Sequence, residues 1–460
     1  MIIIDYYDYL NYNLYDILNY MKNKRWYGDK SLNEKSMEIY DYINMDDFIV
    51  LILKINFDDK YSLYYLPLFL SESESGNKIT HFNINNKKIN VYDAFYFREF
   101  AELIVKNIEN NKKSPKIEFI KTKFFYKNDS NDFKTIKSEQ SNSSFIINSM
   151  IIKNYRYLQY GNNPDIFMAL KLNEYNFYGV PEIYGYMLYK NDNKIIYLAN
   201  AMQYLGNSID LWSYYVNYLR DNKNFRDEII KLTDNISYIT GNMAYNLSKI
   251  SEPDFIPEIM NINDTSYIID NIDNYIKKSL KYMDDHNISY NNILKDIDYN
   301  NIKSIIFSIF KNNKIMKTRV HGDYHLGQIL LYENNYYIID FEGEPVKTIE
   351  ERNKKLSPLK DVAGIIRSID YLIGYFNIDD YNLSNTIKNK FMDNYIRIVS
   401  KGNIFNISTD DLLKLLDIFL LEKASYELYY EINNRPSWIK IPLNFIENTL
   451  KIMQNKNQSL

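Results

Sequence analysis

One short segment, residues 319–345, limits most strongly what this chain can fold into. It contains Arg-Val-His-Gly-Asp-Tyr-His-Leu-Gly-Gln, a short apolar run, and then Tyr-Tyr-Ile-Ile-Asp-Phe-Glu-Gly-Glu-Pro. The carboxyl group of Asp323 is followed by the amide of Gln328, and a second acid, Asp340, ends an apolar strand pattern. The segment therefore offers a general base, oxygen ligands for a metal and their supporting strands within one short stretch.

This spacing matches the pattern H-x-D-x-x-x-x-N followed by D-F-x, which is typical of kinases. Phosphoryl transfer depends mainly on the placement of charge, and oxygen ligands suit Mg²⁺. We therefore predict Asp323 as the catalytic base and Gln328 and Asp340 as Mg²⁺ ligands. Because alternate side chains of a strand share a face, Glu342 can join Asp340 at the metal if Phe341 turns into the core. The two acids alone would favour a solvated turn, and the preceding His-Gly-Asp reverses that preference.

The bulk composition sets wider limits. A chain of 460 residues exceeds what one hydrophobic core usually supports, so we expect two or three packed subdomains. Its hydrophobic and charged fractions, 46% and 25%, are typical of a folded protein. The net charge of −4 provides no basic field for phosphate backbones, so no nucleic-acid partner is expected. The absence of cysteine excludes thiolate nucleophiles, disulfides and cysteine metal sites.

The first residues, Met-Ile-Ile-Ile-Asp-Tyr-Tyr-Asp, include no basic segment, and their apolar run is too short for a signal peptide. No apolar run in the sequence reaches membrane-spanning length. We expect a cytoplasmic protein without a membrane partner.

Residues 1–112 are predicted to form an N-terminal cap subdomain. Phe48–Phe57 and Tyr61–Leu70 are rich in β-branched and aromatic residues and predict a hairpin. Asp93 is a plausible N-cap for a helix whose apolar residues recur at helical spacing. The polar stretch 110–115 ends this helix and marks the first boundary.

Residues 113–203 alternate short strands with one helix and are predicted to complete the N-lobe. The polar loop 139–144 lacks glycine, but its side chains and backbone N–H groups can donate to phosphate oxygens. Lys153 ends an apolar strand, as expected of a lysine that reaches the α- and β-phosphates, although a solvated lysine is the alternative interpretation. Residues 203–206 would form the hinge that binds adenine. The predicted ATP-binding residues are Ser141, Asn142, Ser143, Ser144, Lys153, Gln203, Tyr204 and Leu205.

Residues 204–460 show mainly helical spacing and predict a helical C-lobe that carries the catalytic and sugar sites. A helix is expected to start with Ser357 as N-cap and Pro358 at its first position. Asp361 lies in its first turn, where it would brace the catalytic loop, although a helix-dipole role alone would also explain it. His321 would also support that loop. The predicted fold class is α+β, a bilobal protein-kinase-like fold with an extra N-terminal cap subdomain, a β-rich N-lobe and a helical C-lobe.

Together these segments resemble the maltokinase family, and the resemblance covers nearly the whole chain. The matching segments are residues 25–30 (RWYGDK), 91–94 (VYDA), 140–144 (QSNSS), 321–328 (HGDYHLGQ), 340–345 (DFEGEP), 357–364 (SPLKDVAG), 426–431 (YELYYE) and 434–438 (NRPSW).

The resemblance implies that Mg-ATP phosphorylates maltose at its anomeric hydroxyl, giving maltose 1-phosphate and ADP, in functional association with a trehalose synthase. The C-terminal segments would form part of the sugar site. The sugar-binding residues expected from them and from the catalytic loop are His325, Tyr426, Glu427, Glu431, Arg435 and Trp438. Packing in the core is an equal alternative for Tyr426 and Trp438.

One position departs from the family pattern. The family carries a glutamate that pairs with the phosphate-binding lysine, and Phe167 occupies that position here. Asp165 and Glu174 are both near enough in sequence to replace it. The partner of Lys153 therefore stays open.

Two alternatives to maltose phosphorylation remain. The first is a glucosamine kinase, or a kinase for another sugar, with the same fold. The second is a nucleotide-binding pseudokinase that regulates trehalose metabolism, which only the missing glutamate supports. Retention of Asp323, Gln328, Asp340 and Lys153 argues against that second alternative.

Overall fold

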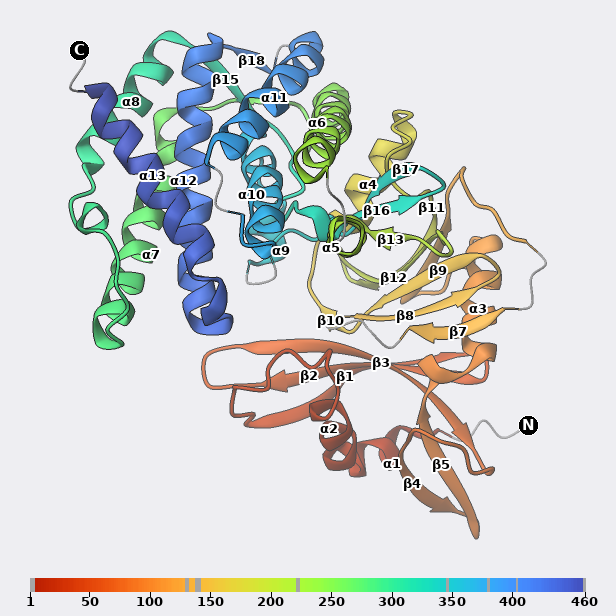
Figure 1. Cartoon of the computed structure of the whole chain (residues 1–460). Coiled ribbons are helices and arrows are strands. Elements are labelled where there is room, and N and C mark those ends of the chain that lie inside the picture. The colour runs from red at the N-terminus through yellow and green to blue at the C-terminus, as the bar shows by residue number, and fades with distance from the viewer. Residues whose placement is uncertain are drawn as a thin grey trace. The chain divides into compact units, whose positions relative to one another are not determined.

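The computed structural model describes residues 5–128, 132–136, 142–220, 224–344, 347–378, 381–402 and 404–457. The chain forms two compact units (Figure 1). The first comprises Met1–Leu170, Pro181–Gly206 and Thr348–Glu350, and the second comprises Lys171–Val180, Asn207–Lys347 and Glu351–Leu460. None of the helices in the described part of the chain combines the length and apolar character needed to cross a bilayer.

The first unit is built on two antiparallel sheets. One sheet has the order β1-β2-β3-β5-β4, with β10 also paired to β3, and the other has the order β6-β11-β12-β9-β8-β7. The elements of this unit are α1 (Tyr7–Tyr12), α2 (Leu14–Lys22), β1 (Ser36–Met45), β2 (Phe48–Asn56), β3 (Tyr61–Ser71), β4 (Lys78–Ile84), β5 (Lys87–Asp93), η1 (Ala94–Tyr96), α3 (Arg98–Glu109), β6 (Ile117–Lys121), β7 (Phe133–Ile136), β8 (Asn142–Ile147), β9 (Met150–Tyr155), β10 (Tyr157–Leu158), β11 (Ile183–Asn191) and β12 (Lys194–Gln203). Helices α4 (Pro164–Glu174) and α9 (Ile349–Arg352) contain residues of both units.

The alternation of side chains along β2 explains why its sequence is apolar almost throughout. Ile49, Leu51 and Leu53 belong to one hydrophobic core, whereas Val50 and Ile52 belong to another on the opposite face. The first core includes α2, and the second includes α3, which packs against the other sheet (Figure 1). The predicted hairpin is confirmed, because β2 pairs with β3 in antiparallel register.

The predicted helix after residue 93 begins later than expected. Asp93 caps the short helix η1 by accepting a hydrogen bond from the N–H of Phe95, and α3 starts only at Arg98. Asp93 also pairs with Arg156, a fully buried residue between β9 and β10. Its Oδ2 lies 2.9 Å from Nη2 of the arginine. A buried guanidinium needs such a partner, so this carboxylate serves packing as well as capping.

The second unit is mainly helical. Its elements are β13 (Ile209–Asp210), α5 (Leu211–Leu219), α6 (Phe225–Lys249), β14 (Glu258–Ile259), η2 (Ile262–Thr265), α7 (Ser266–Asp285), η3 (Asn292–Leu294), α8 (Tyr299–Asn312), β15 (Lys314–Lys317), η4 (Leu326–Gln328), β16 (Ile329–Tyr332), β17 (Asn335–Ile338), α10 (Leu359–Tyr375), α11 (Tyr381–Val399), η5 (Ser400–Gly402), β18 (Phe405–Asn406), α12 (Thr409–Asn434), η6 (Pro436–Trp438) and α13 (Lys440–Asn457). Helix α12 packs against α7, α8, α10 and α13.

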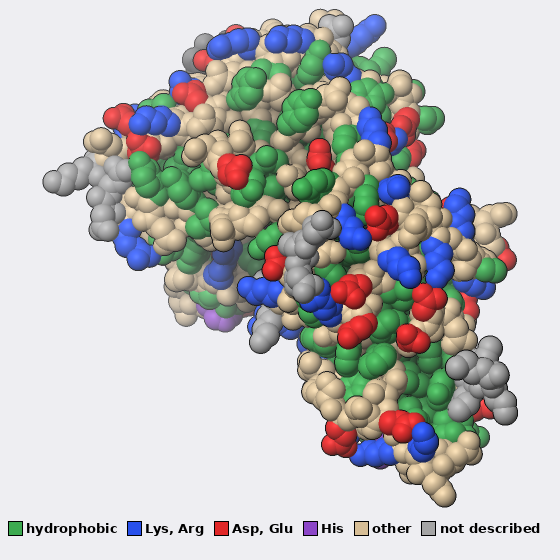
Figure 2. Space-filling model, turned by 90° about the vertical axis from the view of Figure 1, so that its right-hand side faces the viewer, with side chains coloured by type: hydrophobic (Ala, Val, Ile, Leu, Met, Phe, Trp, Pro, Cys, Tyr) green, Lys and Arg blue, Asp and Glu red, His purple; other side chains and the backbone are tan. Residues whose placement is uncertain are grey.

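The start of α10 differs by one residue from the prediction. Leu359 is its first residue and Pro358 occupies the N-cap position, while the Ser357 hydroxyl accepts a hydrogen bond from the N–H of Leu359. Lysine, arginine, aspartate and glutamate side chains are interspersed over the face shown in Figure 2. This mixing is consistent with the small net charge of −4.

Candidate active site

The segment that contains Asp323 is held by the first turn of α10. The carboxylate of Asp361 accepts hydrogen bonds from the backbone N–H of His321, at 2.7 Å, and of Gly322, at 2.9 Å. Burial raises the pKa of Asp361, whereas His321 and the two backbone donors oppose that shift. Gly322 has φ +86°, a conformation that favours glycine. The predicted brace between Asp361 and the loop is therefore present as a pair of hydrogen bonds.

His321 connects this loop to the segment that contains Asp340. Its Nε2 lies 2.9 Å from the carbonyl oxygen of Ile339, and its ring packs against the buried ring of Phe341 at 4.8 Å between centroids. Asp340 itself has φ +59°, in the left-handed region, so the chain turns sharply after β17. Such a conformation is uncommon for a residue other than glycine and recurs at functional sites.

Gln328 is tied to the same segment through the backbone. Its carbonyl oxygen accepts a hydrogen bond from the N–H of Ile339 at 3.0 Å, and its own N–H donates to the carbonyl of His325 at 2.9 Å. The structure therefore brings the segments of Asp323, Gln328 and Asp340 together within the second unit. Glu342 follows two residues later and is half-buried.

Close packing against α10 and α6 fixes the middle of the loop. A Cβ atom at Gly364 would lie 2.6 Å from the carbonyl oxygen of Tyr324, so only glycine permits this approach. The Tyr324 hydroxyl is buried and lies 3.1 Å from the hydroxyl of Thr240. Burial lowers the pKa of His325, which favours the neutral ring, and its Nδ1 accepts a hydrogen bond from Gly327.

In the first unit, Lys153 has an acidic partner. Its Nζ lies 2.9 Å from Oδ2 of Asp165, and both side chains are less than one-tenth exposed. The hydroxyl of Tyr155 donates to the same carboxylate at 3.0 Å, and the amide of Asn200 lies 3.2 Å from that hydroxyl. Asp165 therefore fills the position left open by Phe167, whereas Glu174 pairs with Lys171 at 2.7 Å.

Tyr155 was not among the predicted site residues, although the sequence held a signal for it. Lys153 and Tyr155 are two residues apart on β9, and such residues project to the same face of a strand.

The predicted phosphate loop is only partly described. Ser141 lies outside the described residues. Ser143 and Ser144 lie on β8 and are buried, and the hydroxyl of Ser143 accepts a hydrogen bond from Nε of Arg156 at 2.9 Å. Asn142 begins the strand and is half-buried. The role of these side chains at phosphate stays a prediction.

The predicted hinge ends β12. The N–H of Gln203 donates to the carbonyl of Glu182, and the N–H of Tyr204 donates to the carbonyl of Ser149. Leu205 is buried. These bonds hold the predicted adenine-binding segment against the segments of the first unit that contain Glu182 and Ser149.

The predicted sugar segment lies on α12 and η6. Glu427 accepts a hydrogen bond from Nε of Arg367 at 2.8 Å. Glu431 binds Arg435 at 2.6 Å and accepts from the hydroxyl of Tyr371 at 3.1 Å. Both carboxylates therefore take part in internal ion pairs.

The aromatic residues Tyr426 and Trp438 of this segment are more exposed to solvent than its two glutamates. Trp438 packs near Trp212 and Tyr371, with ring centroids 5.9 Å away in each case. Tyr426 is 38% exposed, and burial of its hydroxyl end raises its pKa to about 12. It stays a neutral hydroxyl donor and acceptor at ordinary pH.

A further ion pair was not predicted. The Oε1 atom of Glu344 lies 3.1 Å from Nζ of Lys360 and 2.9 Å from Nζ of Lys347. Burial opposes ionisation of Glu344, but the two ammonium groups outweigh it and lower its pKa to about 2. Lys347 is only three residues from Glu344, whereas Lys360 belongs to α10, which no local sequence pattern relates to Glu344.

Comparison with known proteins places this geometry in context. No protein-family model matches the sequence. A glucosamine kinase of Streptacidiphilus jiangxiensis is 27% identical over 133 residues, which is 27% of this chain and 29% of that protein. A glucosamine kinase of Mycolicibacterium smegmatis is 40% identical over 52 residues, which is 11% of this chain and 13% of that protein. The chain thus aligns with less than a third of the length of either curated relative.

Solved structures show similarity over far more of the chain. A glucosamine kinase in complex with glucosamine, ADP and inorganic phosphate superposes with a TM-score of 0.68 at 15% identity, covering 90% of this chain and 93% of that one. A second crystal form of a glucosamine kinase also gives a TM-score of 0.68 at 15% identity, covering 92% of this chain and 96% of that one. The chain has this kinase-like fold, and the fold class predicted from the sequence is confirmed.

Proposed function

We propose that this chain transfers the γ-phosphoryl group of ATP to a hydroxyl group of a sugar, with glucosamine as the preferred acceptor. The fold is shared with glucosamine kinase structures, and the partial sequence matches are to proteins of the same name. The acceptor first favoured by the motifs, maltose, becomes the second candidate.

One observation carries the proposal. The His321 ring and the backbone of Gln328 tie the Asp323 loop to the Asp340 segment, and the Asp361 carboxylate ties the same loop to α10. A transferase that works mainly by positioning needs such preorganisation, because small displacements of a base or a ligand reduce the rate strongly.

Asp323 is the base in this mechanism. It accepts the proton of the acceptor hydroxyl while the oxygen of that hydroxyl attacks the γ-phosphorus in line, and ADP leaves. The charge of the phosphates is balanced by Lys153, whose ammonium group is oriented by Asp165 and, through it, by Tyr155. We propose that residues 142–144 and 203–205 contact the nucleotide.

The donor set of the second unit fits Mg²⁺. Gln328, Asp340 and Glu342 all offer oxygen atoms, which this hard cation prefers. When bound, Mg²⁺ neutralises charge on the transferred phosphoryl group. The chain's own part is to hold these oxygens on two segments that the hydrogen bond between Ile339 and Gln328 joins.

We propose that the sugar contacts His325 and Tyr426. The Nδ1 of His325 already accepts from Gly327, so its neutral ring can donate from Nε2 to a sugar hydroxyl, whereas the neutral hydroxyl of Tyr426 can both donate and accept. Glu427 and Glu431 then hold the sugar segment in place through their ion pairs with Arg367 and Arg435. At the end of this segment, the guanidinium of Arg435 packs on the ring of Trp438.

A specific observation keeps maltose as the second candidate. Residues 426–431 and 434–438 match the maltokinase pattern, and a functional association with a trehalose synthase would follow from that acceptor.

The experiment is an acceptor panel. The purified chain is incubated with Mg-ATP and glucosamine, maltose or N-acetylglucosamine, and the products are analysed by phosphorus NMR. We expect a glucosamine phosphate as the main product, and N-acetylglucosamine tests whether a free amine is required. Phosphorylation of maltose alone would shift the assignment to the second candidate. ATP binding without turnover on any sugar would instead support a pseudokinase.

A further inference from the structure

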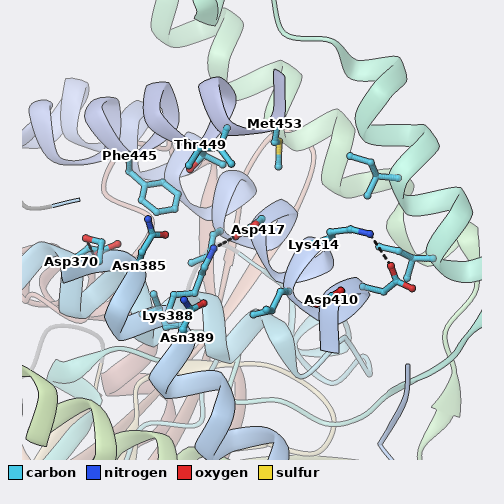
Figure 3. Close-up of a pocket in the computed structure, with 18 of the residues that line it drawn as sticks. Asp370, Asn385, Lys388, Asn389, Asp410, Lys414, Asp417, Phe445, Thr449 and Met453 are labelled. Carbon is cyan, nitrogen blue, oxygen red and sulfur yellow. Dashed lines mark hydrogen bonds and ion pairs between the residues drawn. The ribbon is translucent and has the colours of Figure 1, made fainter. Parts of the chain in front are cut away.

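The second unit contains a double pocket that the proposed phosphoryl transfer does not use. A larger hollow of about 860 Å³ lies among α8, α10, α11, α12 and α13 (Figure 3). A smaller hollow of about 220 Å³ lies between α10, α11 and α13. The two share Asp370, Ser384 and Phe445 in their walls, and we call them together the α13 pocket. Ligand pockets usually enclose about 300–1,000 Å³, so the larger hollow has the size of a binding site.

The smaller hollow includes a buried donor that has no partner. Arg367 is 1% exposed and lines this hollow. Its Nε binds Glu427 at 2.8 Å and its Nη1 binds Asp370 at 3.0 Å, but Nη2 is buried and meets no acceptor among the described residues. A buried N–H without an acceptor is costly, so Arg367, at the wall of this hollow, has the capacity to bind one further oxygen.

The charge around Arg367 defines the kind of oxygen that fits. The guanidinium already faces two carboxylates, Glu427 and Asp370. A third anionic group would meet net negative charge, whereas a neutral hydroxyl can accept from Nη2 without that repulsion.

The larger hollow shows the same preference. Its two ammonium groups are already paired, Lys388 with Asp417 at 2.7 Å and Lys414 with Asp411 at 3.1 Å (Figure 3). Carboxylates outnumber ammonium groups in this wall, because Asp370 and Asp410 also line it. A phosphorylated ligand or a nucleotide is therefore disfavoured.

The rest of the larger hollow is mixed, because aliphatic side chains such as Ile305, Leu413 and Met453 lie beside hydroxyl and amide groups that can bond sugar hydroxyls. Phe445 is half-buried, lines both hollows and lies near Asp370 and Asn385 in Figure 3. The guanidinium of Arg367 lies 4.3 Å from its ring centroid. Amide side chains and an aromatic ring are the groups that bind carbohydrate. Such amide groups in the two hollows are Asn377, Asn385, Asn389, Asn444 and Asn448.

We infer that the α13 pocket is a second carbohydrate site, which binds a short neutral oligosaccharide through Arg367, the amide side chains and Phe445. The pocket shares Arg367 with the proposed sugar segment, whose Glu427 it binds, but its lining includes none of the proposed base and metal ligands Asp323, Gln328, Asp340 and Glu342.

The test is calorimetric titration of the full chain with maltotriose, a neutral oligosaccharide, in the absence of ATP. Wild-type protein is compared with the double variant Asn385→Ala/Asn448→Ala, which removes one amide from each hollow. We expect the double variant to bind maltotriose at least about tenfold more weakly, because two hydrogen bonds to the ligand are lost.

Asn246→Ala is the matched control. This half-buried asparagine on α6 bonds the backbone of its own helix and lies outside both hollows. It should leave maltotriose affinity unchanged. Phe445→Tyr keeps an aromatic ring and should also retain binding, and thermal denaturation of the double variant shows whether it is folded. Absence of binding to wild-type protein, or equal binding by the double variant, would overturn the inference.

Discussion

Asp165 supplies the acidic partner of Lys153 that the sequence left open. It lies in the first turn of α4, and its carboxylate contacts both Lys153 and Tyr155. The sequence alone predicted Lys153 as the phosphate-binding lysine and left Asp165 and Glu174 as alternative partners, because a helix start cannot be placed accurately enough to orient either side chain. The predicted roles of Asp323, Gln328 and Asp340 came from their spacing within residues 319–345, a stretch short enough for local sequence to be informative.

At this residue scale, Asp165→Asn should weaken ATP binding. The variant removes the charge that orients a buried ammonium group, and a hydrogen bond between charged groups contributes about 1.5–3 kcal/mol. We expect the KM for ATP to rise on the order of tenfold. Steady-state kinetics with varied ATP measures this.

Glu174→Gln is the matched control, since Glu174 pairs with Lys171 and not with Lys153. It should leave the KM for ATP unchanged. Equal effects of the two variants would show that Asp165 does not orient the lysine.

At the scale of elements, hairpins and amphipathic helices were predictable from alternation and helical spacing. The β2–β3 hairpin was predicted from its β-branched and aromatic runs, and the predicted start of α10 differs from the observed one by only one residue. The register of α10 against the catalytic loop was not predictable, because it depends on Gly364 meeting Tyr324 across 40 residues of chain. Sequence patterns define which face of a helix is apolar, and they do not define its neighbour.

Gly364→Ala tests this contact. The added methyl group would lie 2.6 Å from the Tyr324 carbonyl oxygen, so the loop or α10 must move. We expect a loss of about 1–3 kcal/mol in the free energy of unfolding and a lower kcat. Thermal denaturation and turnover measure the two effects.

Gly76→Ala serves as the control, because a Cβ atom there meets nothing within 4 Å. If Gly364→Ala behaves like this control, the close approach of α10 does not hold the loop.

At the scale of the whole molecule, the sequence predicted the fold class but not the ion pairs that join distant elements of a unit. Arg367 on α10 binds Glu427 on α12, and Glu344 binds Lys360. Glu427 was expected at the sugar because residues 426–431 resemble the C-terminal segment of the maltokinase family. Its arginine partner lies 60 positions earlier, which no local pattern can indicate.

The Glu344 pair gives a prediction for stability against pH. The pKa of Glu344 in the folded chain, about 2, is below its ordinary value of 4.5. Its stabilising contribution is therefore fully present above about pH 4.5 and is lost as the pH falls towards 2. Glu344→Gln should flatten the decrease in unfolding free energy over this range, as measured by urea denaturation at several pH values.

The exposed Glu350 provides the control. Glu350→Gln should keep the acid-dependent decrease of the wild type. A wild-type-like decrease in Glu344→Gln would contradict the assigned pair.

The most direct test of the central claim is turnover and ATP binding by Asp323→Asn. If Asp323 accepts the proton of the sugar hydroxyl, ADP formation with glucosamine should fall by about 10²–10⁴-fold while ATP affinity is retained. Turnover at the wild-type rate would contradict the account.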